Sequence, residues 1–245
     1  MSTPYTEGER RLRALVRAFL SPGIWLVVGT QLALQLSLQQ ISGAGEAPLA
    51  WVLALSGLLL GFAWLQAGAY HALAQGRDRL LLADMARAGF GRFTRFLWMF
   101  IKLDLSVALL FNVVAFLSML GSGTSPEGLV RGLAPFLGPL LAAVGFLFVY
   151  WLPLVFVTDD FRLFVTLRRA LSTTWQRLPQ SGFLALLILL PPALFTLLPS
   201  EAPLWLLVPL AVGASLLGWA AYIYCAEWLC DAAGASPSPA ETVIP

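Results

Sequence analysis

The sequence predicts an all-α integral membrane protein, a bundle of six transmembrane helices accompanied by three basic amphipathic helices. Apolar residues make up 59% of the 245 residues and the mean hydropathy is +0.80, whereas only 11% are charged. Soluble domains carry roughly 25% charged residues. The apolar residues also form runs of about 18 to 25, the length that a helix needs to cross a hydrocarbon core of about 30 Å. These features exclude a soluble globular enzyme.

Six apolar runs define the expected spans. They cover residues 24–41, 49–72, 97–120, 138–157, 182–198 and 204–229. The fifth run contains Pro191 and Pro192, which leave carbonyls one turn earlier without helical donors and predict a kink. That kink is either a static bend or a hinge at a broken-helix binding site. We expect one membrane domain over residues 1–231 and a disordered tail, rich in Ala, Ser and Pro, over residues 232–245.

The basic residues lie almost entirely between alternate spans. Thirteen of the fifteen precede the first span, follow the second, or follow the fourth. These thirteen are Arg10, Arg11, Arg13, Arg17, Arg77, Arg79, Arg87, Arg92, Arg95, Arg162, Arg168, Arg169 and Arg177. Cytoplasmic loops of bacterial membrane proteins carry such an excess. We therefore expect a multi-pass protein of the bacterial inner (cytoplasmic) membrane with both termini in the cytoplasm.

The three basic segments carry apolar stripes at helical spacing. The stripe of Glu7–Leu20 is Leu12, Leu15, Val16, Phe19 and Leu20, and that of Arg162–Leu178 is Phe164, Leu167, Leu171, Trp175 and Leu178. The middle segment is weaker, because Gly89 and Gly91 interrupt its partial stripe. We expect these helices to lie along the inner face of the membrane, with their stripes buried and their arginines toward anionic phospholipid head groups. The expected lipid-interface residues are Arg10, Arg13, Arg17, Arg87, Arg92, Arg95, Arg162, Arg168, Arg169 and Arg177.

The order of these elements suggests a threefold repeat. Each basic segment contains an Arg-Ala step, at Arg17, Arg87 and Arg169, and each is followed by a pair of spans. The repeating unit is an amphipathic helix and two spans, over about residues 7–73, 77–158 and 160–231. The alternative is that every inward loop of a bacterial membrane protein is basic without any repeat.

One stretch resembles a known family. Residues Pro153–Leu190 read PLVFVTDDFRLFVTLRRALSTTWQRLPQSGFLALLILL. This stretch, under a fifth of the chain, resembles the uncharacterised bacterial six-helix inner-membrane proteins of the YciC type and the related glycerophosphodiester phosphodiesterase membrane domain. Their pattern is a span, an acidic turn, Ala-Leu-Arg-Arg-Ser-Trp-like residues and another span, whereas this chain has Leu-Arg-Arg-Ala-Leu-Ser-Thr-Thr-Trp at Leu167–Trp175. The resemblance implies a six-helix fold and no catalytic residue.

Polar residues within the spans are the candidate functional groups, because a polar side chain in hydrocarbon needs an internal partner. Gln31, Gln35 and Gln39 share one face of the first span. The others are Gln66, His71, Lys102, Asp104 and Asn112. Matching depths on parallel helices predict that the first and third spans touch, with Gln31 near Asp104 and Gln39 near Asn112. These residues either form a pathway for a solute or proton, or hold the helices together.

No motif indicates catalysis, a metal site or a cofactor. Cys225 and Cys230 do not form a C-x-x-C pair, and His71 is the only histidine. The tryptophans near the span ends fit membrane-interface anchors rather than a platform for stacking nucleic acid bases. Gly57 and Gly61 form a G-x-x-x-G pattern, which favours close helix contact in the second span.

The sequence favours a non-catalytic integral membrane protein, a scaffold or accessory subunit that binds anionic phospholipid, a partner membrane protein or a second copy of itself. Its support is the set of basic amphipathic segments, since each Arg near an anionic surface contributes about 1 kcal/mol. The alternative is a transporter or permease subunit for a small polar solute. An intramembrane enzyme ranks third, because His71 has no nearby nucleophile or acid in a recognisable motif.

Overall fold

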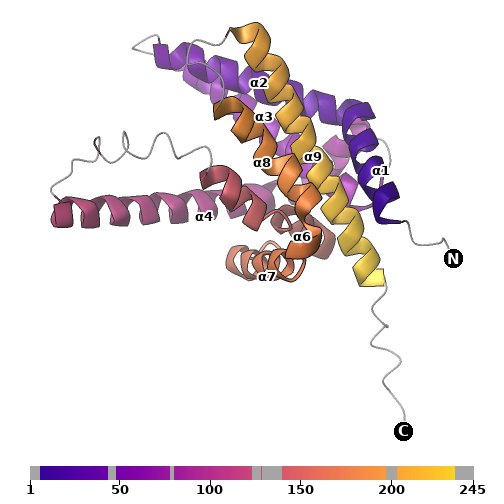
Figure 1. Cartoon of the computed structure of the whole chain (residues 1–245). Coiled ribbons are helices and arrows are strands. Elements are labelled where there is room, and N and C mark those ends of the chain that lie inside the picture. The colour runs from indigo at the N-terminus through magenta and orange to yellow at the C-terminus, as the bar shows by residue number, and fades with distance from the viewer. Residues whose placement is uncertain are drawn as a thin grey trace.

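The computed structural model describes residues 6–43, 48–77, 80–122, 128, 140–196 and 203–234, and the regular elements in these ranges are all helical (Figure 1). The elements are α1 (Glu7–Leu20), α2 (Pro22–Gly43), α3 (Leu49–Ala74), α4 (Leu82–Ser122), α6 (Trp151–Thr158), α7 (Leu163–Gln176), the short 3₁₀ helix η1 (Leu178–Gln180), α8 (Gly182–Thr196) and α9 (Leu204–Gly234). Residues 140–147 are also helical and lead through a turn into α6. The predicted all-α class is confirmed. α9 continues past residue 232, the predicted start of the tail, and residues 235–245 lie outside the described ranges.

Several of these helices are long and apolar enough to cross a membrane. Four qualify by themselves, and they are Leu49–Ala74, Leu82–Leu117, Leu140–Thr158 and Leu204–Ala232. A fifth qualifies if α1 and α2, which are bent by 62° relative to one another, count as one span. Gly182–Phe195 of α8 is apolar but shorter. The described residues therefore show a multi-pass arrangement with four or five candidate spans, while the six spans and the threefold repeat stay predictions.

The bend between α1 and α2 has a local cause in the sequence. Thr6 and Glu9 form a reciprocal capping box at the start of α1, and Ser21 ends the helix in an extended conformation. Pro22 then begins α2, because proline tolerates the first helical position and disfavours a helical residue before it. The predicted helix at Glu7–Leu20 is confirmed as an element separate from the apolar run that follows it.

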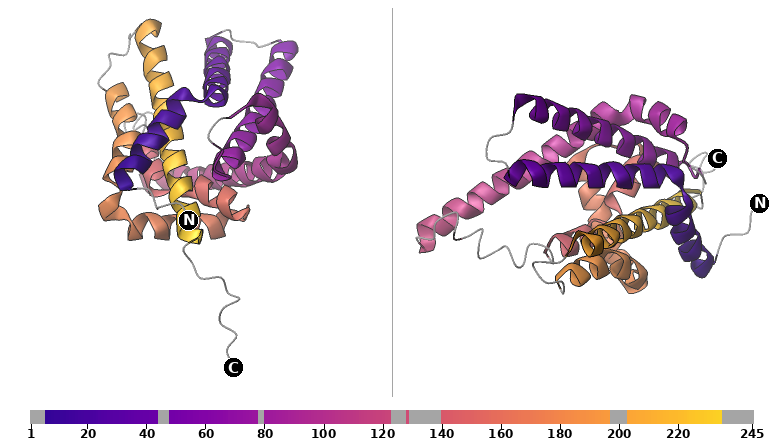
Figure 2. Two further views of the ribbon diagram at one scale, coloured as in Figure 1. Left: turned by 90° about the vertical axis from the view of Figure 1, so that its right-hand side faces the viewer. Right: turned by 90° about the horizontal axis from the view of Figure 1, so that it is seen from above.

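α4 joins the second basic segment and the third predicted span into one helix of 41 residues. Gly89 and Gly91, which interrupt the apolar stripe of the basic segment, lie within this continuous helix. Gly89 lies against the backbone of α3. A Cβ atom added at Gly89 would lie 2.8 Å from the carbonyl oxygen of Trp64. The C-terminal half of α4 leaves the bundle and projects away from the other helices (Figures 1 and 2).

A second glycine brings α3 and α4 together. A Cβ atom added at Gly68 would lie 2.7 Å from the carbonyl carbon of Met85 and closer still to its oxygen. Gly57 and Gly61, in contrast, have nothing within 4 Å of an added Cβ atom. The prediction of close helix contact at Gly57 and Gly61 is therefore wrong for the described residues. The close approach occurs nearer the C-terminal end of α3.

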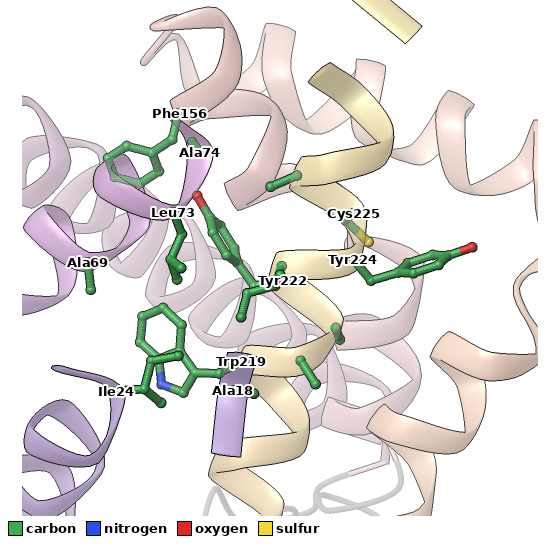
Figure 3. Close-up of a cluster of buried hydrophobic side chains, with 14 of the residues drawn as sticks. Ala18, Ile24, Ala69, Leu73, Ala74, Phe156, Trp219, Tyr222, Tyr224 and Cys225 are labelled. Atoms are coloured by element: carbon green, nitrogen blue, oxygen red, sulfur yellow. The ribbon is translucent and has the colours of Figure 1, made fainter. Parts of the chain in front are cut away.

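The buried core takes side chains from α1, α2, α3, α4, α6, α7, α8 and α9. Figure 3 shows the part of it that α1, α2, α3, α6 and α9 contribute. Tyr70 packs against this core, with its ring centroid 4.7 Å from that of Trp219 and 4.6 Å from that of Tyr222. The Tyr222 hydroxyl donates a hydrogen bond of 2.7 Å to the Tyr70 carbonyl oxygen. Ion pairs join the basic segments to the last turns of α9 and to the turn after α6. We call this region the basic end and define it by α1, the first turns of α4, and α7.

Candidate functional site

Three arginines of α1 pair with acidic residues of α9 at the basic end. Arg10 Nη2 donates a hydrogen bond of 2.7 Å to Asp231 Oδ2. Arg17 forms an ion pair with Glu227, and Arg13 Nε lies 3.6 Å from the same carboxylate. The Arg10 and Arg17 side chains are only 10% and 6% exposed. These contacts fasten α1 along the final helix.

The predicted direction of Arg10 and Arg17, toward lipid head groups, is therefore wrong. Ala14 and Ala18 on the same face are fully buried and let α1 approach α9 closely. Leu12, Val16, Phe19 and Leu20 of the apolar stripe instead lie on the outer surface of the protein, where Leu12 is 64% exposed, while Leu15 packs against the core. Glu227 and Asp231, the partners that account for this orientation, were not among the residues predicted from the sequence. Their spacing of four residues at the end of α9 puts both carboxylates on one helix face and was the signal that could have found them.

The turn after α6 gathers arginines from the other two basic segments. Asp159 has a left-handed backbone with φ of 51°, a conformation that Asp adopts more readily than most residues. The turn's two carboxylates pair with residues of α4 and of the segment that begins α7. Asp159 pairs with Arg92 at 3.1 Å and Arg95 at 3.8 Å, and Asp160 pairs with Arg162 at 2.8 Å and Arg169 at 3.8 Å. Four of the predicted lipid-interface arginines thus have carboxylate partners in the protein.

Asp160 is held in its charged form. Hydrogen bonds from the Arg162 side chain, at 2.9 and 2.8 Å, and from the Arg162 backbone amide, at 3.1 Å, lower the pKa of Asp160 from 3.8 to about 2. A carboxyl whose pKa is lower in the folded state stabilises that state fully above the unfolded pKa. The contribution is lost as pH falls through the folded pKa.

We therefore expect Asp160→Asn to lower the melting temperature by a constant amount above about pH 4. This difference from the parent protein should shrink as the pH approaches 2, because the parent carboxyl is then protonated as well. Melting curves of both proteins in detergent between pH 2 and 7 measure it. A difference that is unchanged at pH 2, or that has already vanished at pH 5, would contradict the assignment.

The outward face of α7 combines basic and apolar groups. Leu163, Thr166, Ala170 and Thr174 are buried and hold the helix to the bundle, with the Trp151 indole donating to Thr166 Oγ1 at 3.0 Å. The opposite face is exposed and bears a hollow of about 560 Å³. Its described lining consists of Phe164, Val165, Arg168, Arg169 and Ser172. We call this set the α7 face.

The two remaining predicted lipid-interface arginines lie in different surroundings. Arg87 is exposed on α4. Arg177 is half-buried, with its guanidinium carbon 3.9 Å from the centroid of the Trp228 ring and its Nη1 donating to the Tyr150 hydroxyl at 3.0 Å. Arg177 therefore connects the end of α7 to α9 and to the residue before α6.

A groove lies between α2, α8 and α9. Its volume is about 560 Å³, and its described lining includes Gln31 and Gln35 of α2, Phe195 of α8 and Ser215 of α9, the rest being Leu, Val and Ala. Two of the three glutamines predicted to share a face thus line one space. The side chain of Gln39 lies outside the described residues. Among the described lining residues none is charged, so the groove favours an uncharged group.

The predicted contact between Gln31 and Asp104 is wrong. α2 packs chiefly against α3 and α9, and Gln31 lines the groove with α8 and α9. Asp104 is exposed on α4, and nearby Lys102 lies 5.5 Å from the centroid of the Trp98 ring. Asn112 donates to the carbonyl oxygen of Ala108 in its own helix at 2.8 Å. Equal predicted depth of Gln31 and Asp104 therefore did not indicate that α2 and α4 pack together at these residues.

The remaining predicted residues are the polar residues of α3 and the two prolines of α8. Gln66 is half-buried and His71 is buried, both in α3. α8 continues through Pro191 and Pro192 to Thr196, so the prolines do not break the helix. In the ranges that the structure describes, no group of three or more His, Cys, Asp or Glu residues could hold a metal ion.

Comparisons of the chain with protein-family models, with curated proteins and with solved structures found no match. The similarity of residues 153–190 to YciC-type proteins therefore stays a prediction, and the functional assignment depends on the geometry described above.

Proposed function

We propose that the chain is a non-catalytic, multi-pass protein of the bacterial inner membrane that binds anionic phospholipid at the cytoplasmic interface. The observation that carries this proposal is the α7 face, where Arg168, Arg169 and Ser172 adjoin exposed Phe164 and Val165 around one hollow. Arg and Ser side chains donate hydrogen bonds to phosphate oxygens. The apolar pair suits the acyl region directly beneath a head group.

The pairing pattern supports α7 rather than α1 as the lipid-binding segment. The arginines of α1 pair with Glu227 and Asp231, so they serve the packing of the chain. The outward stripe of α1 is apolar and can anchor that helix in the interface without them. On α7, Arg169 lies 3.8 Å from Asp160 but is still 56% exposed. Thirteen basic residues on one side of the membrane favour the cytoplasmic orientation.

Removing one charge from the α7 face tests the proposal. We expect Arg168→Gln to weaken binding of phosphatidylglycerol about fivefold, the factor that corresponds to about 1 kcal/mol for one Arg near an anionic surface. Arg87→Gln is the matched control, because Arg87 is also an exposed helical arginine but lies outside the hollow. Native mass spectrometry of the protein with mixed phosphatidylglycerol and phosphatidylethanolamine measures bound lipid. If both variants lost phosphatidylglycerol binding equally, Arg168 would contribute only as one of many surface charges and not as part of a specific site. If neither variant lost binding, lipid binding at α7 would be refuted.

A further inference from the structure

One carboxylate beside the α7 face lies within reach of two arginines. Asp160 belongs to the turn between α6 and α7, and its side chain is only 14% exposed. Arg162 donates three hydrogen bonds to it, from the backbone amide at 3.1 Å and from the guanidinium at 2.9 and 2.8 Å. Arg169 Nη1 lies 3.8 Å from Asp160 Oδ2. Hydrogen bonds between a guanidinium and a carboxylate are about 2.7 to 2.9 Å long, so Asp160 is bonded to Arg162 and only close to Arg169.

Arg169 is the arginine of this pair that belongs to the α7 face. It lines the hollow together with Arg168 and Ser172, whereas Arg162 is not among the described lining residues. Its side chain is 56% exposed, and a guanidinium has five N–H donors that a phosphate can accept. A movement of about 1 Å would nevertheless turn its ion pair with Asp160 into a charge-assisted hydrogen bond. A head-group phosphate and Asp160 are therefore competing acceptors for Arg169.

Arg162 decides this competition through the way it holds Asp160. Its Nε donates to Oδ1 and its Nη2 to Oδ2, so that both carboxylate oxygens are engaged in the strong bidentate geometry. A carboxylate with little exposure needs such partners, because burial removes the hydration of its charge. Without the Arg162 side chain, Arg169 is the other guanidinium beside Asp160 in the described part of the chain.

We propose that Arg162 is a positioning residue of the lipid site, which occupies the Asp160 carboxylate and so leaves Arg169 to the phosphate of an anionic phospholipid. Arg162 acts through Asp160 and does not itself touch the head group. When the Arg162 side chain is removed, Asp160 binds Arg169, and the hollow loses one of its two guanidinium donors although the residue is still present. This inference rests on the proposed lipid binding at α7 and names the contact that regulates it.

A mutant cycle between Arg162 and Arg169 tests the role, with binding of phosphatidylglycerol by the full chain measured by native mass spectrometry. We expect Arg162→Gln and Arg169→Gln each to weaken binding about fivefold, the effect of one Arg at an anionic surface. The double variant should also be weakened only about fivefold, because Arg169 is already withdrawn in Arg162→Gln. Two arginines that acted independently would give a loss of about 25-fold.

Arg95 provides the matched control for this cycle. It is 64% exposed and lies 3.8 Å from a carboxylate of the same turn, but that carboxylate is Asp159. Replacing Arg95 by Gln therefore leaves Asp160 bonded to Arg162. In the Arg95→Gln background, Arg169→Gln should still weaken binding about fivefold.

Asp160→Asn separates positioning from a purely structural role. It removes the same ion pair as Arg162→Gln, but it also removes the charge that would bind Arg169. Binding of phosphatidylglycerol should therefore be retained or strengthened in Asp160→Asn, and it should return to the parent value in the double variant Asp160→Asn, Arg162→Gln. If the ion pair served only to hold the shape of α7, Asp160→Asn would lose binding as Arg162→Gln does.

Four outcomes would overturn the role of Arg162. They are unchanged binding in Arg162→Gln, a loss of about 25-fold in the double variant with Arg169→Gln, a loss in Asp160→Asn, and the absence of rescue by Asp160→Asn. The proposed function fails separately, and the role of Arg162 with it, if Arg168→Gln and Arg169→Gln both bind phosphatidylglycerol like the parent protein. A loss in Arg168→Gln and Arg169→Gln with none in Arg162→Gln would refute the positioning role and leave the lipid site in place.

Discussion

Replacing Glu227 with Ala should destabilise the protein by about 3 to 5 kcal/mol, the loss expected when one partner of a buried ion pair is removed. Arg17 is only 6% exposed and forms an ion pair with Glu227. The same carboxylate lies near Arg13. Removal of Glu227 therefore takes a shared carboxylate away from one deeply buried guanidinium and one partly buried guanidinium on the face of α1 that packs on α9.

Asp231→Ala is the matched control for this result. Asp231 is also an acid of α9 that pairs with an arginine of α1, but its side chain is 55% exposed. Exposed ion pairs contribute at most about 1 kcal/mol. Arg10 also keeps a second carboxylate, because Glu7 lies 3.5 Å away. We therefore expect a much smaller loss than for Glu227→Ala.

The free energy of unfolding in mixed detergent and dodecyl sulfate measures both variants. Protease cleavage within residues 7–20 separately reports whether α1 has left α9. The double variant Arg17→Met, Glu227→Leu should recover most of the loss, because apolar residues of similar volume replace buried ion pairs well. Equal losses for Glu227→Ala and Asp231→Ala would show that burial of the pair does not determine its contribution.

The α1 segment shows which part of the fold the sequence could predict. The apolar spacing predicted its helix with the bounds that the structure has. They could not predict which face packs on the protein, because an apolar face suits lipid as well as a protein core. In a membrane protein the polar face is often the one that needs protein partners. Glu227 and Asp231, more than 200 residues later, decide the orientation of α1.

For the candidate sites too, the sequence could predict which residues share a helix face but not which helix that face contacts. The sequence predicted that Gln31 and Gln35 share a face, because helical spacing determines that relation, and both line the groove. It could not predict their neighbours, since depth along parallel helices says nothing about which helices are adjacent. The arginines of α7 were predicted individually. Their placement next to Phe164 and Ser172 follows from spacings of four residues, but the hollow depends on which face of α7 packs against the bundle.

Glycine contacts were the least predictable feature. The G-x-x-x-G spacing selected Gly57 and Gly61, yet an added Cβ atom at either position meets open space. Gly68 and Gly89 belong to no such pattern within one helix. They form a pair across two helices, where Gly68 meets the backbone of Met85 and Gly89 meets the backbone of Trp64. A spacing rule within one helix cannot detect a close contact to which each of two helices contributes a single glycine.

The second large effect is expected at Gly68. Gly68→Ala should destabilise the protein by about 1 to 3 kcal/mol, the usual effect of adding a methyl group to a closely packed site. An alanine Cβ atom would lie 2.7 Å from the Met85 carbonyl carbon, and backbone cannot rotate away as a side chain can. α3 and α4 must then separate, which loosens the contact of Tyr70 with Phe96.

Gly61→Ala is the control for this prediction, because the same methyl group is added to the same helix in open space. It should be neutral or should stabilise the protein by up to about 1 kcal/mol, since Ala favours the helix more than Gly does. Unfolding free energies of Gly61→Ala and Gly68→Ala in the same detergent should therefore differ in sign or strongly in size. Gly89→Ala should resemble Gly68→Ala, because it meets the same pair of helices from the other side. If Gly61→Ala and Gly68→Ala behaved alike, the close crossing of α3 and α4 at Met85 would be wrong, and the projecting direction of α4 that follows from this crossing would have to be revised with it.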